Sequence, residues 1–437
     1  MSRLFKIVTL GCKVNQYESA FVEESLIDLG CQNVNQGGEA DLVVINTCIV
    51  TARASYQSRQ AIRRAMKENP GAVIAAIGCY GQAFPGELSK INGVDLIAGN
   101  KGKSSLPGIL ARAGHHHPPL IVREDFEASS SFEEIPVKGF SDKTRAFLKI
   151  QDGCESFCSY CIVPASRGPL RSLDPDKVIR ILRDLEGKGY KEVVLTGIHL
   201  GEYGSDLTNG IDLTRLLIEI GRNRFQSRIR LSSLEPTEIE RDLIELVAGH
   251  DWLCRHFHIP LQSGDDAVLK MMNRHYSARM FTRVIHDIDR LVPKVSIGVD
   301  VLVGFPGESD RAFSNTIDLL RDLPISYLHV FPYSRREGTV AARSSDHLDN
   351  KRIKERAFLL RCLDRKKREM FWGSLMGETF PILTEGWVPG GRTLIRGLSD
   401  NYVRFVFPST SLIKNEIVRV RAAGITEKGI AGQRVVD

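Results

Sequence analysis

The chain has 437 residues, 42% of them hydrophobic and 26% charged, which is the composition of an ordinary folded globular protein. This length exceeds what a single hydrophobic core usually organises, so we expect two or three domains. The formal net charge of +6 is a weak indication of an anionic partner, and no apolar run approaches the roughly 20 residues of a membrane-spanning helix.

Strand and helix patterns alternate in the first part of the sequence, which we interpret as a first domain covering residues 1–135. The predicted strands are 5–10, 41–46, 72–77 and 95–98, and the predicted helices are 18–29 and 52–68. Such βαβ alternation predicts a doubly wound parallel sheet. Between about 101 and 143 the pattern weakens into a polar linker that contains His115, His116 and His117.

Three cysteines, Cys12, Cys48 and Cys79, each fall just past the carboxyl end of a predicted strand. Those ends share one edge of an open parallel sheet, where ligand crevices form. A single cysteine at such a place is often only a small buried residue. Three in register, each beside a Gly or Thr, favour three thiolates that hold an iron–sulfur cluster.

The chain has nine cysteines, and three of them show no sign of binding a metal. Cys31, Cys254 and Cys362 have no comparable placement, and we interpret them as structural. Leu10-Gly11-Cys12 loosely resembles a lipoprotein cleavage site, but too few residues precede it for a charged region and an apolar core of roughly 7–15 residues. We therefore expect a cytoplasmic protein with reduced cysteines and no membrane attachment.

The alternation resumes in a second domain, residues 140–370. The predicted strands are 146–151, 192–197, 228–234, 256–261, 295–303 and 327–331, separated by helical segments such as 176–187 and 310–323. Six βα units predict a partial (βα)6 barrel, whose active site lies at the carboxyl ends of the strands.

The loop after the first of these strands carries Cys154, Cys158 and Cys161 in the spacing C-x3-C-x2-C. Three thiolates on one short loop can hold three irons of a cubane cluster. A fully liganded cluster takes four cysteines, so the fourth iron stays open for another ligand. A zinc site is the alternative, for which His256 and His258 would have to complete the ligand set.

The last part of the sequence changes character. Residues 351–369 form a basic helical segment with nine Lys/Arg against three Asp/Glu, which by default is a solvated helix. Residues 373–437 carry short alternating strands at 380–384, 402–406 and 417–420, which predicts a small all-β barrel. Such barrels bind single-stranded nucleic acid through basic grooves and stacking aromatics. Phe405 and Phe407 alternate with Arg404 and either stack on bases or fill the core.

Together the three parts resemble the radical SAM methylthiotransferases over essentially the full length. The matching segments are 9–19, 46–48, 78–79, 154–168, 195–201, 232–236, 258–264 and 300–308. The resemblance implies a radical SAM barrel, a C-terminal TRAM domain, S-adenosylmethionine and two [4Fe–4S] clusters. The cluster of Cys154, Cys158 and Cys161 would reductively split S-adenosylmethionine, and the other cluster would carry the sulfur to be inserted. A first S-adenosylmethionine would methylate that sulfur, and a second would make the radical.

The segment Gly11-Cys12-Lys13-Val14-Asn15 is similar to the branch that acts on N6-threonylcarbamoyladenosine beside the tRNA anticodon. Two other branches stay open as alternatives. One acts on N6-isopentenyladenosine of tRNA and the other on an aspartate of a ribosomal protein. An alternative of another class is an iron–sulfur protein that binds RNA or transfers electrons without turnover.

Contacts to S-adenosylmethionine are expected at the barrel mouth. Gly197 allows close backbone approach after the second strand. Tyr160 could pack on the adenine, and Gln262, Arg274 and Asp300 could make polar contacts. As partners the family implies the tRNA anticodon stem-loop, an electron donor such as flavodoxin or ferredoxin, and a sulfur source. We expect a monomer.

Overall fold

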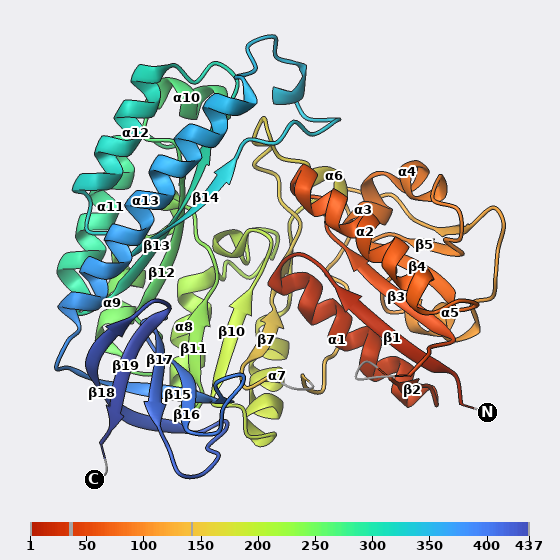
Figure 1. Cartoon of the computed structure of the whole chain (residues 1–437), viewed down its shortest axis with the longest axis horizontal. Coiled ribbons are helices and arrows are strands. Elements are labelled where there is room, and N and C mark those ends of the chain that lie inside the picture. Colours follow the sequence, from red (N-terminus) through yellow and green to blue (C-terminus); the bar gives the residue numbers. More distant parts are fainter. Residues whose placement is uncertain (1, 35–37, 141–142, 436–437) are drawn as a thin grey trace.

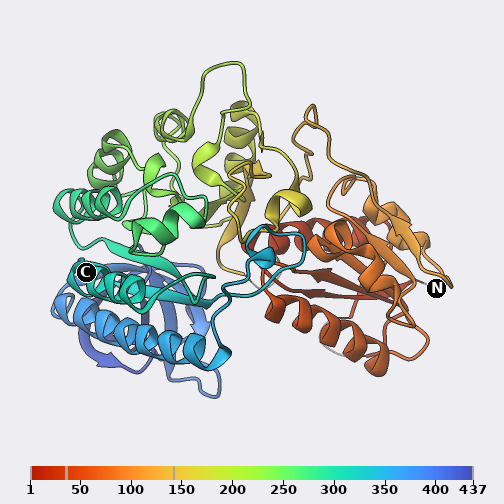
Figure 2. The ribbon, with the colours of Figure 1, turned by 90° about the horizontal axis from the view of Figure 1, so that it is seen from above.

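The computed structural model describes residues 2–34, 38–140 and 143–435, arranged as three parts (Figure 1). An N-terminal sheet with its helices stands beside a central set of strands and helices, and a small barrel lies below the central part. The view from above places the N-terminal part on one side and the other two parts together on the other side (Figure 2). Among the described residues, no helix has both the length and the apolar character needed to cross a bilayer.

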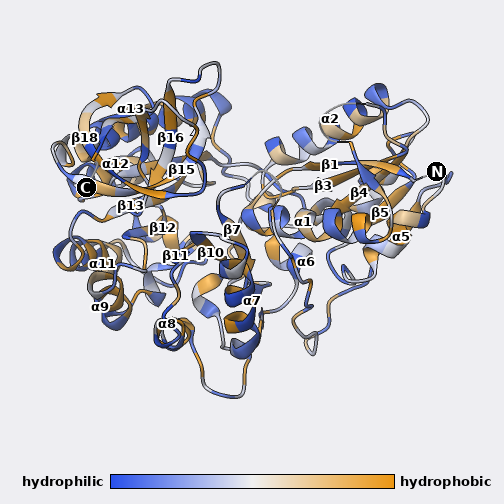
Figure 3. Cartoon of the chain, turned by 90° about the horizontal axis from the view of Figure 1, so that it is seen from below, coloured by the Kyte–Doolittle hydropathy of each residue, from blue (hydrophilic) through white to orange (hydrophobic). Residues whose placement is uncertain are grey.

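The N-terminal sheet is parallel and has the strand order β2-β1-β3-β4-β5-β6. Its strands are β1 (Leu4–Thr9), β2 (Gln32–Asn33), β3 (Leu42–Thr47), β4 (Val73–Gly78), β5 (Leu96–Ala98) and β6 (Leu120–Val122). Every residue of β3 and β4 is buried, as expected for central strands covered on both faces. The predicted doubly wound sheet is confirmed: α2 covers one face, and α1 and α5 cover the other (Figure 3).

The helices of this part are α1 (Lys13–Asp28), α2 (Ala52–Glu68), α3 (Cys79–Ala83), α4 (Pro85–Ser89) and α5 (Leu106–Arg112). The prediction that the first helix starts at Glu18 was wrong, because α1 begins at Lys13 with Cys12 as its N-cap residue. The segment from 101 to 143 is also more than a polar linker. It contains α5 and β6, whose short apolar runs are completed by packing and pairing against the sheet.

The central part contains all six predicted strands, but they form two sheets of three. The longer strands are β7 (Ala146–Lys149), β10 (Glu192–Thr196), β11 (Arg228–Leu231), β12 (His256–Gln262), β13 (Ser296–Val303) and β14 (Tyr327–Pro332), in the orders β11-β10-β7 and β12-β13-β14. Backbone hydrogen bonds join the halves, from Ile229 to Trp252, from Cys254 to Ile229 and from Leu234 to His258. The partial barrel is therefore open between β7 and β14.

Helices cover the outside of this partial barrel. They are α7 (Pro175–Gly187), α8 (Leu213–Arg222), α9 (Arg241–Gly249), α10 (Asp266–Met271), α11 (Ala278–Leu291), α12 (Asp310–Asp322) and α13 (Asn350–Ser374), whereas α6 (Val163–Arg167) packs against α3 of the N-terminal part. A short antiparallel pair, β8 (Gln151–Asp152) and β9 (Arg171–Ser172), flanks the loop after the first strand. Because α13 packs along β14, it is only partly the solvated helix that its charge predicts.

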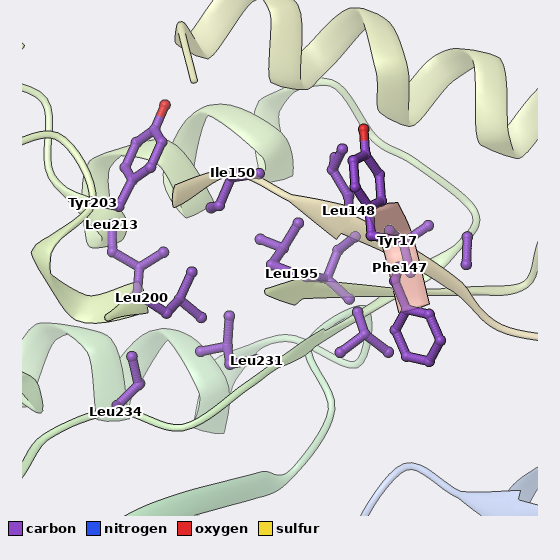
Figure 4. Close-up of a cluster of buried hydrophobic side chains, with 14 of the residues drawn as sticks. Tyr17, Phe147, Leu148, Ile150, Leu195, Leu200, Tyr203, Leu213, Leu231 and Leu234 are labelled. Carbon is purple, nitrogen blue, oxygen red and sulfur yellow. The ribbon is translucent and has the colours of Figure 1, made fainter. Parts of the chain in front are cut away.

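One hydrophobic core runs from the N-terminal part into the central part. Tyr17 of α1 lies over Phe147 and Leu148 of β7, next to Leu195 of β10 (Figure 4). The Tyr17 hydroxyl donates a hydrogen bond to the Ile135 carbonyl at 2.9 Å. The two parts are thus held together by shared apolar burial, the main favourable contribution to folding.

The C-terminal strands close into a barrel in the order β15-β16-β17-β19-β18. They are β15 (Thr379–Trp387), β16 (Leu394–Ser399), β17 (Arg404–Pro408), β18 (Ile417–Thr426) and β19 (Gly429–Arg434). Two of them, β16 and β19, were not predicted. The barrel is the fold expected of a TRAM domain, and closure removes exposed sheet edges.

Buried arginines attach this barrel to the central sheet. Arg228 donates to the carbonyls of Pro381 and Leu398, and Arg230 donates to those of Ser399 and Asp400. Both arginines are also paired with Glu192 of β10, which is fully buried. Burial opposes ionisation of that carboxyl, yet the two guanidinium groups hold the pKa of Glu192 well below its usual range.

Candidate active site

The three N-terminal cysteines meet at one edge of the sheet, as their positions predicted. Cys12 is the N-cap residue of α1, Cys48 follows β3, and Cys79 begins α3 directly after β4. The sulfur atoms of Cys12 and Cys79 lie 3.8 and 4.0 Å from the same atom, Oδ1 of Asn15. Gly11 has a φ of +99°, and a Cβ there would lie 3.0 Å from Sγ of Cys48. This tight approach of the backbone to the thiol therefore requires glycine.

The residues of this triplet differ in exposure. Cys12 as a whole residue is exposed, whereas Cys48 and Cys79 are buried, yet burial raises the pKa of the Cys12 thiol too. Burial, and then the neighbouring thiol of Cys79, raise the pKa of Cys48 to about 11. A metal that binds there would replace these protons, because thiolates are the ligands that iron–sulfur clusters use.

The fully buried Arg167 contacts the N-terminal triplet from the central part. Its Nε lies 3.3 Å from Sγ of Cys79, and its Nη2 donates to Asn15 Oδ1 at 2.7 Å. Its Nη1 donates to Glu18 of α1 at 2.5 Å. Arg167 is the last residue of α6, which begins two residues after Cys161.

A network of buried charges surrounds this arginine. Glu18 is also paired with Lys103 and lies 3.6 Å from Nζ of Lys149, which in turn is 2.9 Å from Asp152. Burial opposes the charge on Glu18, but Arg167, Lys103 and Lys149 lower its pKa to about 2. The network therefore keeps the carboxylates ionised where α1 meets the central part.

The second triplet, Cys154, Cys158 and Cys161, lies on the loop between β8 and α6 and lines a cavity of about 630 Å³. The amide of Cys161 donates to the carbonyl of Cys158 at 2.9 Å, which closes a turn between the two ligand positions. Gly153 opens the loop with a φ of +78°, and a Cβ there would lie 1.7 Å from the Pro169 carbonyl oxygen. Only glycine permits that crossing of the chain.

Two side chains from other segments of the central part reach these thiols. Nδ1 of His199 lies 3.6 Å from Sγ of Cys154, and His199 is also paired with Glu238. Although burial opposes its charge, those two partners raise the pKa of His199 to about 11. Nη1 of Arg274 donates to Sγ of Cys158 at 3.3 Å, while Nη2 is paired with Glu235.

In neither triplet do all three sulfurs lie within the span of a single zinc ion. With Zn–S bonds of about 2.3 Å, no two sulfurs of one zinc site lie more than about 4.6 Å apart. Among the described residues, the groups with three ligand atoms within 4.8 Å of one another are His258, Asp300 and His329, and His199, Glu202 and Glu238. Neither cysteine triplet is among them, and His256 is hydrogen-bonded to Tyr327 instead.

Of the other predicted contact residues, Tyr160 lies on the cysteine loop and Gln262 at the end of β12, whereas Asp300 lies within β13 and not at its carboxyl end. Tyr160 packs against Phe305, 6.4 Å between ring centroids. Gln262 ends β12 with a φ of +63° at an irregularity of the ladder. Asp300 accepts from His258 at 2.7 Å, and His329 lies 3.3 Å from it.

Gly197 lies against the side chain of Gln151. A Cβ on Gly197 would lie 2.7 Å from Oε1 of Gln151, and that oxygen accepts from the His199 amide at 2.7 Å. The glycine thus lets Gln151 hold the turn that presents His199.

Sequence reasoning missed the polar side chains that contact the thiols. Asn15, Arg167 and His199 lie in segments that carry the family resemblance, at 9–19, 154–168 and 195–201. That resemblance was the available signal. Their contacts with cysteines up to 88 residues away along the chain could not be read from local patterns.

The open side of the barrel, between β7 and β14, holds a cavity of about 240 Å³ closed off by the C-terminal barrel. Its lining is rich in cations and aromatic rings: Arg145, His329, Arg368, Trp372, Tyr402, Arg404 and Lys428. Phe405 and Phe407 are fully buried, so they fill the barrel core and are not free to stack on bases. Lys367 is buried too and donates to the carbonyls of Arg321 and Leu323.

Lys13 directly follows Cys12 of the N-terminal triplet and is affected by the charges of Arg230 and Arg145. Burial, followed by the positive charges of Arg230 and Arg145, lowers its pKa to about 8. Its charge also affects His256 inside the barrel. Lys13 forms no ion pair with any carboxylate in the part of the chain that the structure describes.

Comparisons with known proteins agree with this geometry. Residues 148–320 match the radical SAM superfamily, and residues 4–99 match the uncharacterized protein family UPF0004. A radical S-adenosylmethionine methyltransferase, TsrM from Kitasatospora setae, shares the fold with a TM-score of 0.56 at 15% identity. The match covers 78% of this chain and 77% of that one.

Relatives of known name are similar over nearly the whole chain. The threonylcarbamoyladenosine tRNA methylthiotransferase MtaB of Bacillus subtilis is 38% identical over 94% of this chain and 92% of its own. The protein of the same name from Aquifex aeolicus is 39% identical over 86% and 91%. A tRNA-2-methylthio-N(6)-dimethylallyladenosine synthase of Moorella thermoacetica is 32% identical over 96% and 95%. The chain therefore belongs to the radical SAM tRNA methylthiotransferase family.

Proposed function

We propose that this enzyme converts N6-threonylcarbamoyladenosine beside the anticodon of tRNA into its 2-methylthio derivative, using S-adenosylmethionine and two [4Fe–4S] clusters. Cys154, Cys158 and Cys161 would hold one cluster, and the N-terminal triplet the other. The observation that carries the proposal is the joining of the two triplets by α6, which starts beside Cys161 and ends at Arg167 against Cys79. Both triplets offer three thiolates, so each leaves one iron position open.

With its cofactors bound, the site would supply a 5′-deoxyadenosyl radical and a sulfur atom for insertion at an aromatic C–H, a position inert to acid–base catalysis. The residues of the chain supply binding and orientation. Arg274 and His199 hold the Cys154–Cys161 loop through its sulfurs. Tyr160, Gly197, Gln262 and Asp300 would surround S-adenosylmethionine.

The charge around Lys13 supports the threonylcarbamoyl substrate over the isopentenyl one. The threonylcarbamoyl group ends in a carboxylate, whereas the isopentenyl group is a neutral hydrocarbon. Lys13 has charged neighbours in Arg145, Arg230 and Glu192, and Glu192 is itself paired with both of these arginines. An anionic substituent would offer this half-buried lysine an ion-pair partner, whereas a hydrocarbon would not.

The cavity between β7 and β14 supports a route for the RNA strand. Its cations Arg404 and Lys428 can neutralise phosphates, and Trp372 and Tyr402 offer rings for stacking. The reaction further needs a one-electron donor of the flavodoxin or ferredoxin class and a source of sulfur. We propose that the enzyme acts as a monomer in the cytoplasm, because the chain itself contributes both triplets and the barrel.

The experiment that tests the proposal compares two substrates with one enzyme. The reconstituted protein is incubated with S-adenosylmethionine, a reductant and anticodon stem-loops that carry either threonylcarbamoyladenosine or isopentenyladenosine. We expect the methylthio product from the first RNA at the higher rate, measured by mass spectrometry of nucleosides. Faster conversion of the isopentenyl RNA would overturn the substrate assignment, and no product from either RNA would overturn the activity.

A further inference from the structure

We propose that Arg167 sets the reduction potential of the N-terminal cluster and fixes the position of that cluster relative to the radical SAM loop. This inference rests on the proposed function, because it requires a cluster at Cys12, Cys48 and Cys79. It assigns a role to a side chain that neither binds substrate nor supplies a ligand to iron. Arg167 is therefore a positioning residue.

The geometry gives the thiol of Cys79 two donors that both depend on α6. Arg167 donates through Nε to Sγ at 3.3 Å. Asn100 donates through Nδ2 to the same Sγ at 3.4 Å and to the carbonyl of Ser166 at 2.7 Å. Since Ser166 and Arg167 end α6, any shift of that helix changes both hydrogen bonds to the sulfur.

The positive charge of Arg167 should affect the reduction potential of the cluster. Hydrogen bonds to the sulfurs, net charge and solvent exposure set the potentials of iron–sulfur clusters. A reduced cluster carries one more negative charge than an oxidised one. A buried guanidinium against a ligand sulfur stabilises that extra charge, because the surroundings screen it poorly. Removal of Arg167 should therefore lower the reduction potential.

A neighbour of Arg167, Lys103, allows an effect on the cluster to be distinguished from an effect of packing. Lys103 is buried and, like Arg167, is paired with Glu18. No described thiol lies within hydrogen-bonding distance of the Lys103 ammonium. The two residues thus share burial and a carboxylate partner but differ in the contact to sulfur, which makes Lys103 the matched control.

The experiment measures the N-terminal cluster alone. In a background with Cys154, Cys158 and Cys161 changed to Ala, the potential is determined by a redox titration followed by electron paramagnetic resonance. Arg167→Met should lower it by about 59 mV, a tenfold change in a one-electron equilibrium. Arg167→Lys should recover part of the shift, because it keeps the charge. Lys103→Met removes a buried charge but no hydrogen bond to sulfur, so it should lower the potential by clearly less than Arg167→Met does.

Loss of a buried cation can prevent folding, so a charge-balanced variant is included. Arg167→Met with Glu18→Gln removes both partners of the pair, which is far less costly than removing one. A smaller shift in the same direction should persist in this variant, because the hydrogen bond to the sulfur is still lost while removal of the Glu18 charge offsets part of the lost positive charge. A potential unchanged by Arg167→Met or by the double variant, or an equal shift with Lys103→Met, would overturn the inference. If the background protein bound no cluster at all, the proposed two-cluster function would fall instead.

Discussion

Nη1 of Arg274 lies 3.3 Å from Sγ of Cys158, although 116 residues separate the two along the chain. Arg167 has the same separation, 3.3 Å, from Cys79 of the other triplet. Each set of three cysteines is thus approached by one arginine from outside its own loop. Both arginines also hold a carboxylate, Glu235 in one case and Glu18 in the other, so their position does not depend on a cluster being bound.

The radical SAM triplet can be tested by its removal. Changing Cys154, Cys158 and Cys161 together to Ala should remove about half of the bound iron and abolish 5′-deoxyadenosine formation, since three cysteines anchor one cluster. Iron analysis and chromatography of the nucleoside products measure the two effects. Continued cleavage of S-adenosylmethionine by the triple variant would contradict the assignment.

The N-terminal triplet should separate sulfur insertion from radical formation. Replacement of Cys12, Cys48 and Cys79 by Ala should leave S-adenosylmethionine cleavage in place and stop methylthiolation, because these thiols lie on a different sheet from the radical SAM loop. The iron content should again fall by about half. A variant that kept its full iron would show that these cysteines only pack the sheet edge.

Lys13 provides a test of substrate choice. Lys13→Gln should raise KM for the threonylcarbamoyladenosine stem-loop roughly 10- to 100-fold, the range expected when a partly buried charge pair of about 1.5–3 kcal/mol is lost. Lys67→Gln, an exposed lysine on α2, removes the same charge and should have no such effect. Equal KM values for the two variants would refute a role for Lys13 in recognising the substrate carboxylate.

The attachment of the C-terminal barrel to the central sheet can be tested by measuring the free energy of unfolding. Arg230→Met should cost about 3–5 kcal/mol of unfolding free energy, because it leaves Glu192 short of one buried partner and two carbonyls without their donor. Arg215→Met, which removes an exposed pair with Asp212, should cost less than about 1 kcal/mol. Denaturant titrations of both variants compare the two costs, and similar values would show that the barrel is held by other contacts.

The parts of this molecule that follow local patterns could be predicted from its sequence. Short apolar runs located β1, β3, β4, β5 and all six strands of the partial barrel, and the position of Cys12, Cys48 and Cys79 just past strand ends predicted that they meet at one edge of the sheet. The cysteine loop could be recognised from its C-x3-C-x2-C spacing alone, without knowledge of the fold. These features depend on residues close together in the chain or on the topology of parallel sheets.

Other features depend on packing between distant segments and could not be predicted in that way. The start of α1 at Lys13 needs Cys12 as an N-cap without a hydrogen-bonding side chain, which is not a usual start signal. The strands β6, β16 and β19 form where a paired neighbour completes a short run. The contact of Arg167 with Cys79 requires the N-terminal and central parts to be docked.

The most direct test of the account is mass spectrometry of tRNA nucleosides from cells with and without this gene. We predict that 2-methylthio-N6-threonylcarbamoyladenosine is present in cells with the gene. In cells without it, that nucleoside should disappear and N6-threonylcarbamoyladenosine should accumulate in its place. An unchanged nucleoside profile, or loss of the methylthio isopentenyl nucleoside instead, would contradict the account.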